Sequence, residues 1–307
     1  MNAEPSLHFV TCSGAAAHGD AHAHRMAYWQ WRPLREEDAG HVIVCVHGLT
    51  RQGRDFDVLA QTLRLNARII CPDVVGRGRS DWLANPMAYG VGQYVQDMVA
   101  MLQQLHAQTP IHTLDWLGTS MGGLIGMTLL AQAQDALPVA VRKLLLNDIG
   151  PQLEWPALQR IGSYVGRDPR FANEIDAAQA LRALSQGFGP HTDAQWMALT
   201  RPMLQPSACG GWKLHYDPAI GSPMQGMTQQ QADQGNAVLW QLYDVIKAQT
   251  LLVRGAASDL ISAQTAQAMQ GRGPRARTIA LENVGHAPTF VASDQVRLAQ
   301  QFFLGDE

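Results

Sequence analysis

Residues 114–123 have the sequence LDWLGTSMGG. The stretch from Ile111 to Leu117, which overlaps its beginning, is a mostly apolar run of strand length. Residues 124–131 (LIGMTLLA), which follow it, are typical of an apolar helix. Between the two lies Gly118-x-Ser120-x-Gly122, the spacing of a very tight turn from a strand into a helix. Glycine at both flanking positions removes Cβ atoms that would clash there. The pattern therefore predicts that the Ser120 hydroxyl stands clear of the backbone as a nucleophile.

The helix that follows this turn also supplies hydrogen-bond donors. The first N–H groups of a helix have no intrahelical acceptor and point toward the turn. An oxyanion formed by attack from Ser120 would meet the N–H of Met121. The same glycine and serine spacing occurs by chance in glycine-rich loops, so the functional interpretation depends on the strand before it and the helix after it.

Composition narrows the class of protein. The chain has 307 residues, of which 46% are apolar and 16% charged, so it can bury a sizeable core. Its net charge of −3 gives no electrostatic reason to bind nucleic acid or an anionic membrane. The four cysteines include no CxxC pair, so neither a zinc site nor a redox pair is expected, and no cofactor is implied. The first residues show no secretory signal, and no apolar run is long enough to span a membrane, so we expect a cytoplasmic protein.

Strands and helices alternate along most of the chain. Apolar runs predict buried strands, and apolar residues at helical spacing predict helices between them. An α/β fold follows, with a mostly parallel central sheet and helices on both faces. The expected strands are 7–12, 26–31, 41–46, 68–73, 111–117, 141–146, 250–255 and 277–281, and the expected helices are 56–65, 94–105, 124–131, 239–246, 263–270 and a final helix capped by Ser293.

The alternation breaks between residues 151 and 235. This segment has many glycines and prolines and no buried-strand run, so we interpret it as a mainly helical cap inserted into a core made of residues 1–150 and 236–307. Its large aromatic residues could wall a pocket; a stretch of ordinary core helices is the alternative. The aromatic residues are Trp155, Tyr164, Phe171, Phe188, Trp196, Trp212 and Tyr216.

A serine hydroxyl needs a base to take its proton. In parallel sheets, ligands bind beyond the carboxyl ends of the strands, so the base should leave another strand at the same edge as Ser120. His286 does so, in Gly285-His286-Ala287 after the last expected strand. His47 also follows a strand, but the adjacent Gly48 favours a tight structural turn.

An acid should hold the imidazole in one tautomer. Asp259 follows the strand 250–255 and is our first choice, and Asp148, which also ends a strand, is the rival. Choosing Asp259 gives the chain order Ser120, Asp259, His286, which is the order expected of one hydrolase fold.

These motifs make the chain resemble the α/β-hydrolase superfamily, from about His41 to the C-terminus. They are His47-Gly48-Leu49, Gly76-Arg77-Gly78-Arg79-Ser80, Gly118-Thr119-Ser120-Met121-Gly122-Gly123, Ser258-Asp259 and Gly285-His286. The resemblance implies that Leu49 supplies a second oxyanion N–H beside Met121. Members that carry a carboxylate at the nucleophile position, such as dehalogenases and epoxide hydrolases, are excluded by Ser120. The His-Gly-Gly-Gly loop of one esterase branch is absent, since this chain has His47-Gly48-Leu49-Thr50.

The function expected from this resemblance is hydrolysis of small carboxylic esters through an acyl-enzyme. Hydrolysis of a carbon–carbon bond in a ring-cleavage diketone, cofactor-free perhydrolysis, and a non-catalytic binding protein remain as alternatives. Arg51 and Arg54 follow the expected oxyanion loop and could meet an acidic substrate group, although solvated surface arginines are the simpler reading. The histidine-rich residues 18–24 favour a solvated turn over a metal site. The sequence leaves the oligomeric state open, a homo-oligomer included.

Overall fold

A computed structural model describes residues 4–14 and 23–305, and its centre is an eight-stranded sheet. The strand order is β1-β2-β4-β3-β5-β6-β10-β11. The pairs β1–β2 and β2–β4 are antiparallel, and every later pair is parallel. The strands are β1 (Ser6–Ser13), β2 (Ala23–Trp31), β3 (His41–Val46), β4 (Arg68–Asp73), β5 (Thr113–Thr119), β6 (Val141–Asn147), β10 (Gln249–Gly255) and β11 (Arg277–Leu281).

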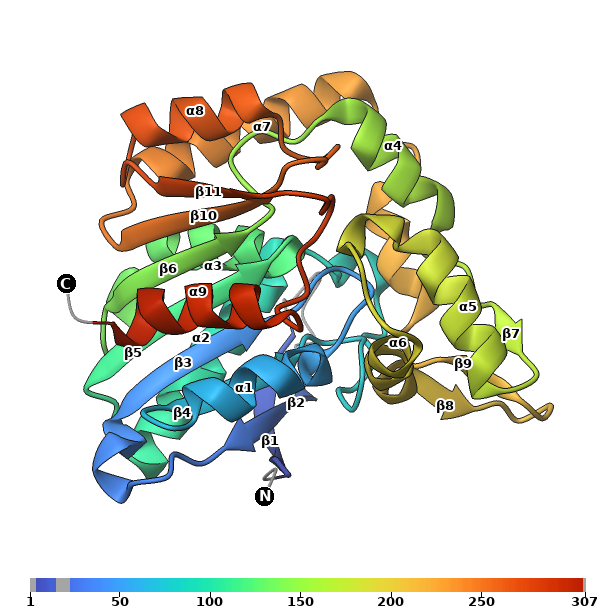
Figure 1. Cartoon of the computed structure of the whole chain (residues 1–307), viewed down its shortest axis with the longest axis horizontal. Coiled ribbons are helices and arrows are strands. Elements are labelled where there is room, and N and C mark those ends of the chain that lie inside the picture. Colours follow the sequence, from blue (N-terminus) through green and yellow to red (C-terminus); the bar gives the residue numbers. More distant parts are fainter. Residues whose placement is uncertain (1–3, 15–22, 306–307) are drawn as a thin grey trace.

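Helices cover both faces of this sheet (Figure 1). One face carries α1 (Asp57–Leu63) and α9 (Ser293–Leu304), whose apolar side chains share one buried cluster. The opposite face carries the helices that share the second cluster, namely α2 (Val91–Gln108), α3 (Met121–Gln132), α7 (Gln229–Asp244) and α8 (Ala263–Gly271). The predicted α/β class with helices on both faces is confirmed.

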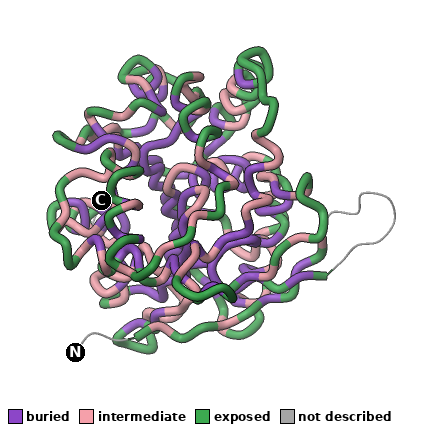
Figure 2. The backbone as a smooth tube through the Cα atoms, turned by 90° about the vertical axis from the view of Figure 1, so that its right-hand side faces the viewer, coloured by how far each residue is buried: buried purple, intermediate pink, exposed green. Residues whose placement is uncertain are grey.

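The sequence of β3 shows why its strand is apolar throughout. Val42, Val44 and Val46 point into the α2 and α3 side, whereas Ile43 and Cys45 point into the α1 and α9 side. A parallel strand covered on both faces has no solvent side, so polar residues do not alternate along it. The buried residues, purple in Figure 2, accordingly lie mostly in the middle of the molecule.

The segment between β6 and α7 lies beyond one end of the sheet (Figure 1). It contains three α-helices, as expected of a helical cap, and also a three-stranded antiparallel sheet in the order β7-β9-β8. These strands are two or three residues long, too short to give a periodic pattern in the sequence. The elements are α4 (Trp155–Tyr164), β7 (Arg170–Phe171), α5 (Glu174–Leu184), α6 (Asp193–Thr200), β8 (Leu204–Pro206) and β9 (Trp212–Leu214).

Two predicted helix starts differ from the structure. The helix expected over residues 239–246 already begins at Gln229, where Thr228 and Gln231 form a reciprocal capping box. Ser293 was expected to cap the last helix, yet it is the first helical residue and Ala292 occupies the cap without a side-chain bond. Among residues 4–14 and 23–305, no helix combines the length and apolarity needed to cross a membrane.

Candidate active site

Ser120 lies in the turn between β5 and α3, with φ 52° and ψ −115°. A positive φ is strained for a residue with a side chain, and such strain persists only where the surroundings enforce it. Here two glycines allow a very close approach. A Cβ on Gly118 would lie 2.3 Å from the Gly122 carbonyl oxygen, and one on Gly122 would lie 2.1 Å from that of Val46. The glycine spacing therefore sets the turn that exposes the serine.

His286 lies in the loop between β11 and α9, with its ring directed at this turn. Its Nε2 lies 3.0 Å from Ser120 Oγ, and its Nδ1 lies 2.8 Å from a carboxylate oxygen of Asp148. The His286 side chain is 14% exposed and that of Asp148 is fully buried. Because a carboxylate only accepts, Nδ1 carries the proton that is donated to Asp148, and Nε2 is left free to accept from Ser120.

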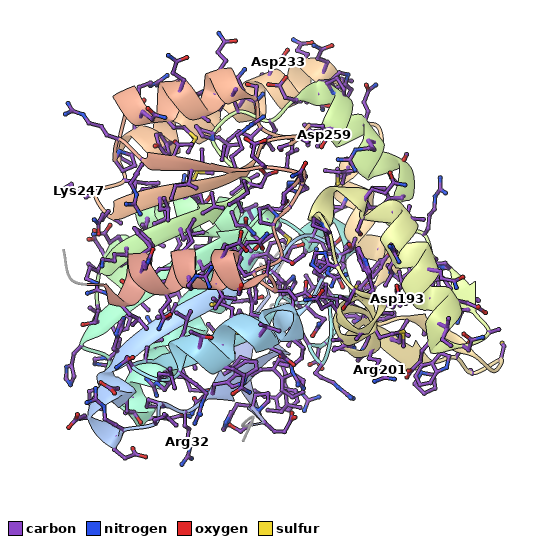
Figure 3. All side chains as sticks on the ribbon, in the orientation of Figure 1. Arg32, Asp193, Arg201, Asp233, Lys247 and Asp259 are labelled. Atoms are coloured by element: carbon purple, nitrogen blue, oxygen red, sulfur yellow. The ribbon has the colours of Figure 1, made fainter. Side chains whose placement is uncertain are left out.

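Asp148, and not Asp259, is the carboxylate at the imidazole, so our first choice for the acid was wrong. Asp148 also accepts hydrogen bonds from the Gly255 N–H at 2.7 Å and from the Ser258 hydroxyl at 2.6 Å. With His286, these donors compensate the cost of burying the anion. Asp259 is 49% exposed and instead accepts from Arg160 of α4, at 2.7 Å from its Nε. Figure 3 places Asp259 beside α4 at the outside of the molecule.

The order of the strands explains this choice. β6 lies directly beside β5, so Asp148, the residue after β6, emerges next to the strand that carries Ser120. β10 lies between β6 and β11. The loop after β10 folds so that the Ser258 hydroxyl meets Asp148 while the next residue, Asp259, turns toward the cap.

The loop after β3 is held by a buried histidine. His47 Nδ1 donates to the Gly48 carbonyl at 2.7 Å, and its Nε2 accepts from the Val74 N–H at 3.0 Å. Burial lowers the pKa of His47 to about 3, so the ring stays neutral and keeps this tautomer. In a trans peptide the N–H points opposite to the carbonyl. Fixing the Gly48 carbonyl therefore also fixes the direction of the Leu49 N–H.

Two cavities meet at Ser120. The first, of about 260 Å³, is lined by Leu49, Ser120 and His286 together with cap residues from α4 to β9. The second, of about 310 Å³, is lined by Leu49, Ser120 and Met121 together with apolar residues of α3, α4 and α7. Of the seven cap aromatics, Tyr164, Phe188 and Tyr216 line the first cavity. A hydroxyl between two cavities can react with a substrate that has a group on each side of the reacting carbon.

Comparison with known proteins identifies the family of this chain. The model of the alpha/beta hydrolase family matches residues 43–300. The chain belongs to the alpha/beta hydrolase family. The predicted superfamily and the expectation of a hydrolase are therefore confirmed.

The similarity to related proteins covers nearly the whole of this alpha/beta hydrolase. A 3-hydroxybutyrate-oligomer hydrolase of Cupriavidus necator is 44% identical over 308 residues, covering 99% of this chain and 100% of that protein. An alpha/beta hydrolase of Novosphingobium aromaticivorans superimposes with a TM-score of 0.80 at 31% identity, covering 99% of both chains. A putative hydrolase of Rickettsia typhi gives a TM-score of 0.83 at 26% identity, covering 98% of this chain and 100% of that one.

The arginines predicted near the site have partners. Arg51 lines the first cavity, but its guanidinium binds Asp55 through Nε at 2.6 Å and a second nitrogen at 2.7 Å. Arg54 binds Asp57 and lies over the Trp29 ring, and the first cavity does not include it. Two arginines that the sequence did not single out, Arg160 and Arg167, do line that cavity. They come from α4 and from the loop after it, where no motif marks them.

One buried group of side chains has the residue types that could bind a metal ion. His18 and His22 of the histidine-rich stretch lie outside the described residues. His24 lies in β2, and its Nε2 donates to Asp97, which also accepts from Gln93 at 2.7 Å. Cys12 lies close to both, so these side chains could offer three ligand atoms. Burial and the nearby Asp97 raise the pKa of Cys12, which keeps the thiol protonated and opposes metal ligation.

Proposed function

We propose that this alpha/beta hydrolase cleaves carboxylic esters through an acyl-enzyme on Ser120. The observation that supports the proposal is the hydrogen-bonded chain from Ser120 Oγ through His286 to Asp148, placed where two cavities meet. His286 Nε2 takes the serine proton as Oγ attacks the ester carbonyl, and Asp148 stabilises the imidazolium. The proton then passes to the leaving alcohol oxygen. Water, activated by the same imidazole, hydrolyses the acyl-serine.

The oxyanion formed in both steps would be bound by the N–H groups of Met121 and Leu49. Met121 is the first residue of α3, so its N–H has no acceptor within the helix. The Leu49 N–H is oriented by the His47 bond to the Gly48 carbonyl, and the Leu49 carbonyl is held by Arg77 Nε at 2.9 Å. A rigid donor pair costs little reorganisation when charge develops.

The substrate class that we propose is a short ester of a hydroxy acid. The support is the 44% identity to the 3-hydroxybutyrate-oligomer hydrolase, which extends over nearly the whole of both chains. Such an ester has an acyl half and an alcohol half, and each of the two cavities can receive one of them. A dimer of 3-hydroxybutyrate is the simplest substrate of this class.

A fluorophosphonate probe and a substrate panel test the proposal. The probe should label Ser120 in the wild-type protein and not in Ser120→Ala, whose kcat should fall by about 10³-fold or more. The panel contains p-nitrophenyl butyrate, the 3-hydroxybutyrate dimer and a dienone ring-cleavage product. Absence of labelling would favour a binding protein, and turnover of the dienone alone would favour carbon–carbon hydrolysis.

A further inference from the structure

The two cavities differ in what they offer the two halves of an ester. This inference builds on the proposed ester hydrolysis. His286 lines the first cavity, and Met121 lines the second. The leaving alcohol oxygen must receive a proton from His286 Nε2. The alcohol half of the substrate therefore belongs in the first cavity, and the acyl half belongs in the second.

Placing an anion in the second cavity carries a large free-energy cost. Among residues 23–305, its lining includes no charged side chain. Of its amide residues, Asn236 bonds both backbone groups of Leu153, and the side-chain oxygen of Gln231 accepts within the α7 capping box. Moving a carboxylate into such surroundings costs far more than leaving it in water. An ester with one charged end therefore has to place that end elsewhere.

The first cavity is lined by arginines, and one of them has no ion-pair partner among the described residues. Three arginines are the charged side chains that line it within the described part of the chain. Arg51 is paired with Asp55, and Arg160 is paired with Asp259. Arg167 has neither an ion pair nor a side-chain hydrogen bond to any residue that the structure describes.

The backbone of Arg167 is held in place although its side chain is exposed. Its N–H donates to the Tyr164 carbonyl at 3.2 Å, and its own carbonyl accepts from the Tyr216 hydroxyl at 2.8 Å. Tyr164 and Tyr216 line the same cavity. The backbone of Arg167 is thus fixed at the wall of the first cavity, and its guanidinium extends from this fixed position.

We propose that Arg167 binds the terminal carboxylate of the alcohol half of the substrate. In a hydroxy-acid dimer this half is the unit with the free carboxylate, and the other half ends in a neutral hydroxyl. The charged end then lies at Arg167, the ester carbonyl at Ser120, and the hydroxyl end in the uncharged second cavity. The first cavity, at about 260 Å³, is smaller than the roughly 300–1,000 Å³ of typical ligand pockets, which suits a short leaving unit.

The test compares substrates that differ only in this charge. We would measure kcat and KM for the 3-hydroxybutyrate dimer, for its methyl ester, and for p-nitrophenyl butyrate. Wild-type enzyme should prefer the free acid. Arg167→Gln should lower kcat/KM for the free acid by about 10- to 100-fold, mainly through KM, because a charged hydrogen bond is lost. The same variant should lower kcat/KM for the two uncharged substrates much less than for the free acid, because neither carries a carboxylate for Arg167 to bind.

Two further variants complete the experiment. Arg167→Lys retains the charge and should recover part of the loss. Arg297→Gln removes an equal charge from an exposed position on α9 and should change none of the three substrates. Equal wild-type rates on the acid and its methyl ester, or an unchanged rate on the acid in Arg167→Gln, would overturn the role of Arg167. Failure of the ester mechanism is a separate result, seen as loss of p-nitrophenyl butyrate turnover and of Ser120 labelling in the wild type.

Discussion

Replacing Asp148 by asparagine should change the proton position on His286. The carboxylate of Asp148 accepts from the Gly255 N–H, the Ser258 hydroxyl and His286 Nδ1. An asparagine can keep its oxygen on Gly255, but its amide group then donates toward Nδ1. Two donors cannot face each other, so the ring must move its proton to Nε2. In that tautomer, Nε2 cannot take the proton of Ser120.

We expect kcat of Asp148→Asn to fall by about 10⁴-fold, the loss expected for a wrong tautomer, which corresponds to about 5 kcal/mol in the barrier. Stability should change less. The Ser258 hydroxyl can rotate from donor to acceptor, and one weakened buried hydrogen bond costs about 1–3 kcal/mol. The assay is kcat on p-nitrophenyl butyrate, together with urea unfolding of each variant.

Asp259→Asn is the matched control. It removes an ion pair between half-exposed partners, 43% and 49% exposed, which contributes about 0–1 kcal/mol to stability. Its kcat on the uncharged ester should remain near the wild-type value. A collapse of kcat in Asp259→Asn, with near-normal turnover in Asp148→Asn, would refute the role given to Asp148.

Three other outcomes can be checked with the same assays. Gly122→Ala should destabilise the fold by at least about 1–3 kcal/mol because its Cβ would overlap the Val46 carbonyl, whereas Gly162→Ala in α4 meets no atom and should be neutral or stabilising in urea unfolding. His47→Asn should lower kcat about 10-fold or more because the Leu49 N–H is no longer fixed. The pKa of His47 is about 3 in the folded protein and about 6.5 unfolded, so the unfolded chain takes up a proton first. Stability from this group is full above pH 6.5 and falls by at most about 1.4 kcal/mol per pH unit toward pH 3, and the stability gap between wild type and His47→Asn should narrow accordingly.

The parallel strands of the core could be predicted from the sequence because each is marked by a local pattern of residues. The strands His41–Val46 and Arg68–Asp73 have the expected ends, since continuous apolar runs bounded by polar residues define them. Ser120 and His286 could be proposed because glycines mark both turns and each residue follows a strand. Their meeting at 3.0 Å depends on all parallel strands ending at one edge.

The acid could not be chosen in this way. Asp148 and Asp259 both follow strands, and chain order does not tell which strand lies beside β5. The deciding contacts are lateral: β6 pairs with β5, and the Gly255 N–H and Ser258 hydroxyl converge on Asp148 from the next loop. Arg167 was missed for a related reason. Its importance depends on which arginines are already paired, and the Arg160–Asp259 pair spans 99 residues of sequence.

The misassigned Asp259 leads to a final prediction about the first cavity. Its carboxylate neutralises Arg160, which lines that cavity. Asp259→Asn therefore leaves a second guanidinium available beside Arg167 without altering Ser120, His286 or Asp148. If the cavity receives the charged end of the substrate, this variant should raise kcat/KM for the free-acid dimer about two- to fivefold, the range of an exposed charge pair, and the gain should shrink in high salt. The methyl ester should show no gain. An equal change in kcat/KM for the free acid and the methyl ester in Asp259→Asn would contradict the assignment of the charged end to this cavity.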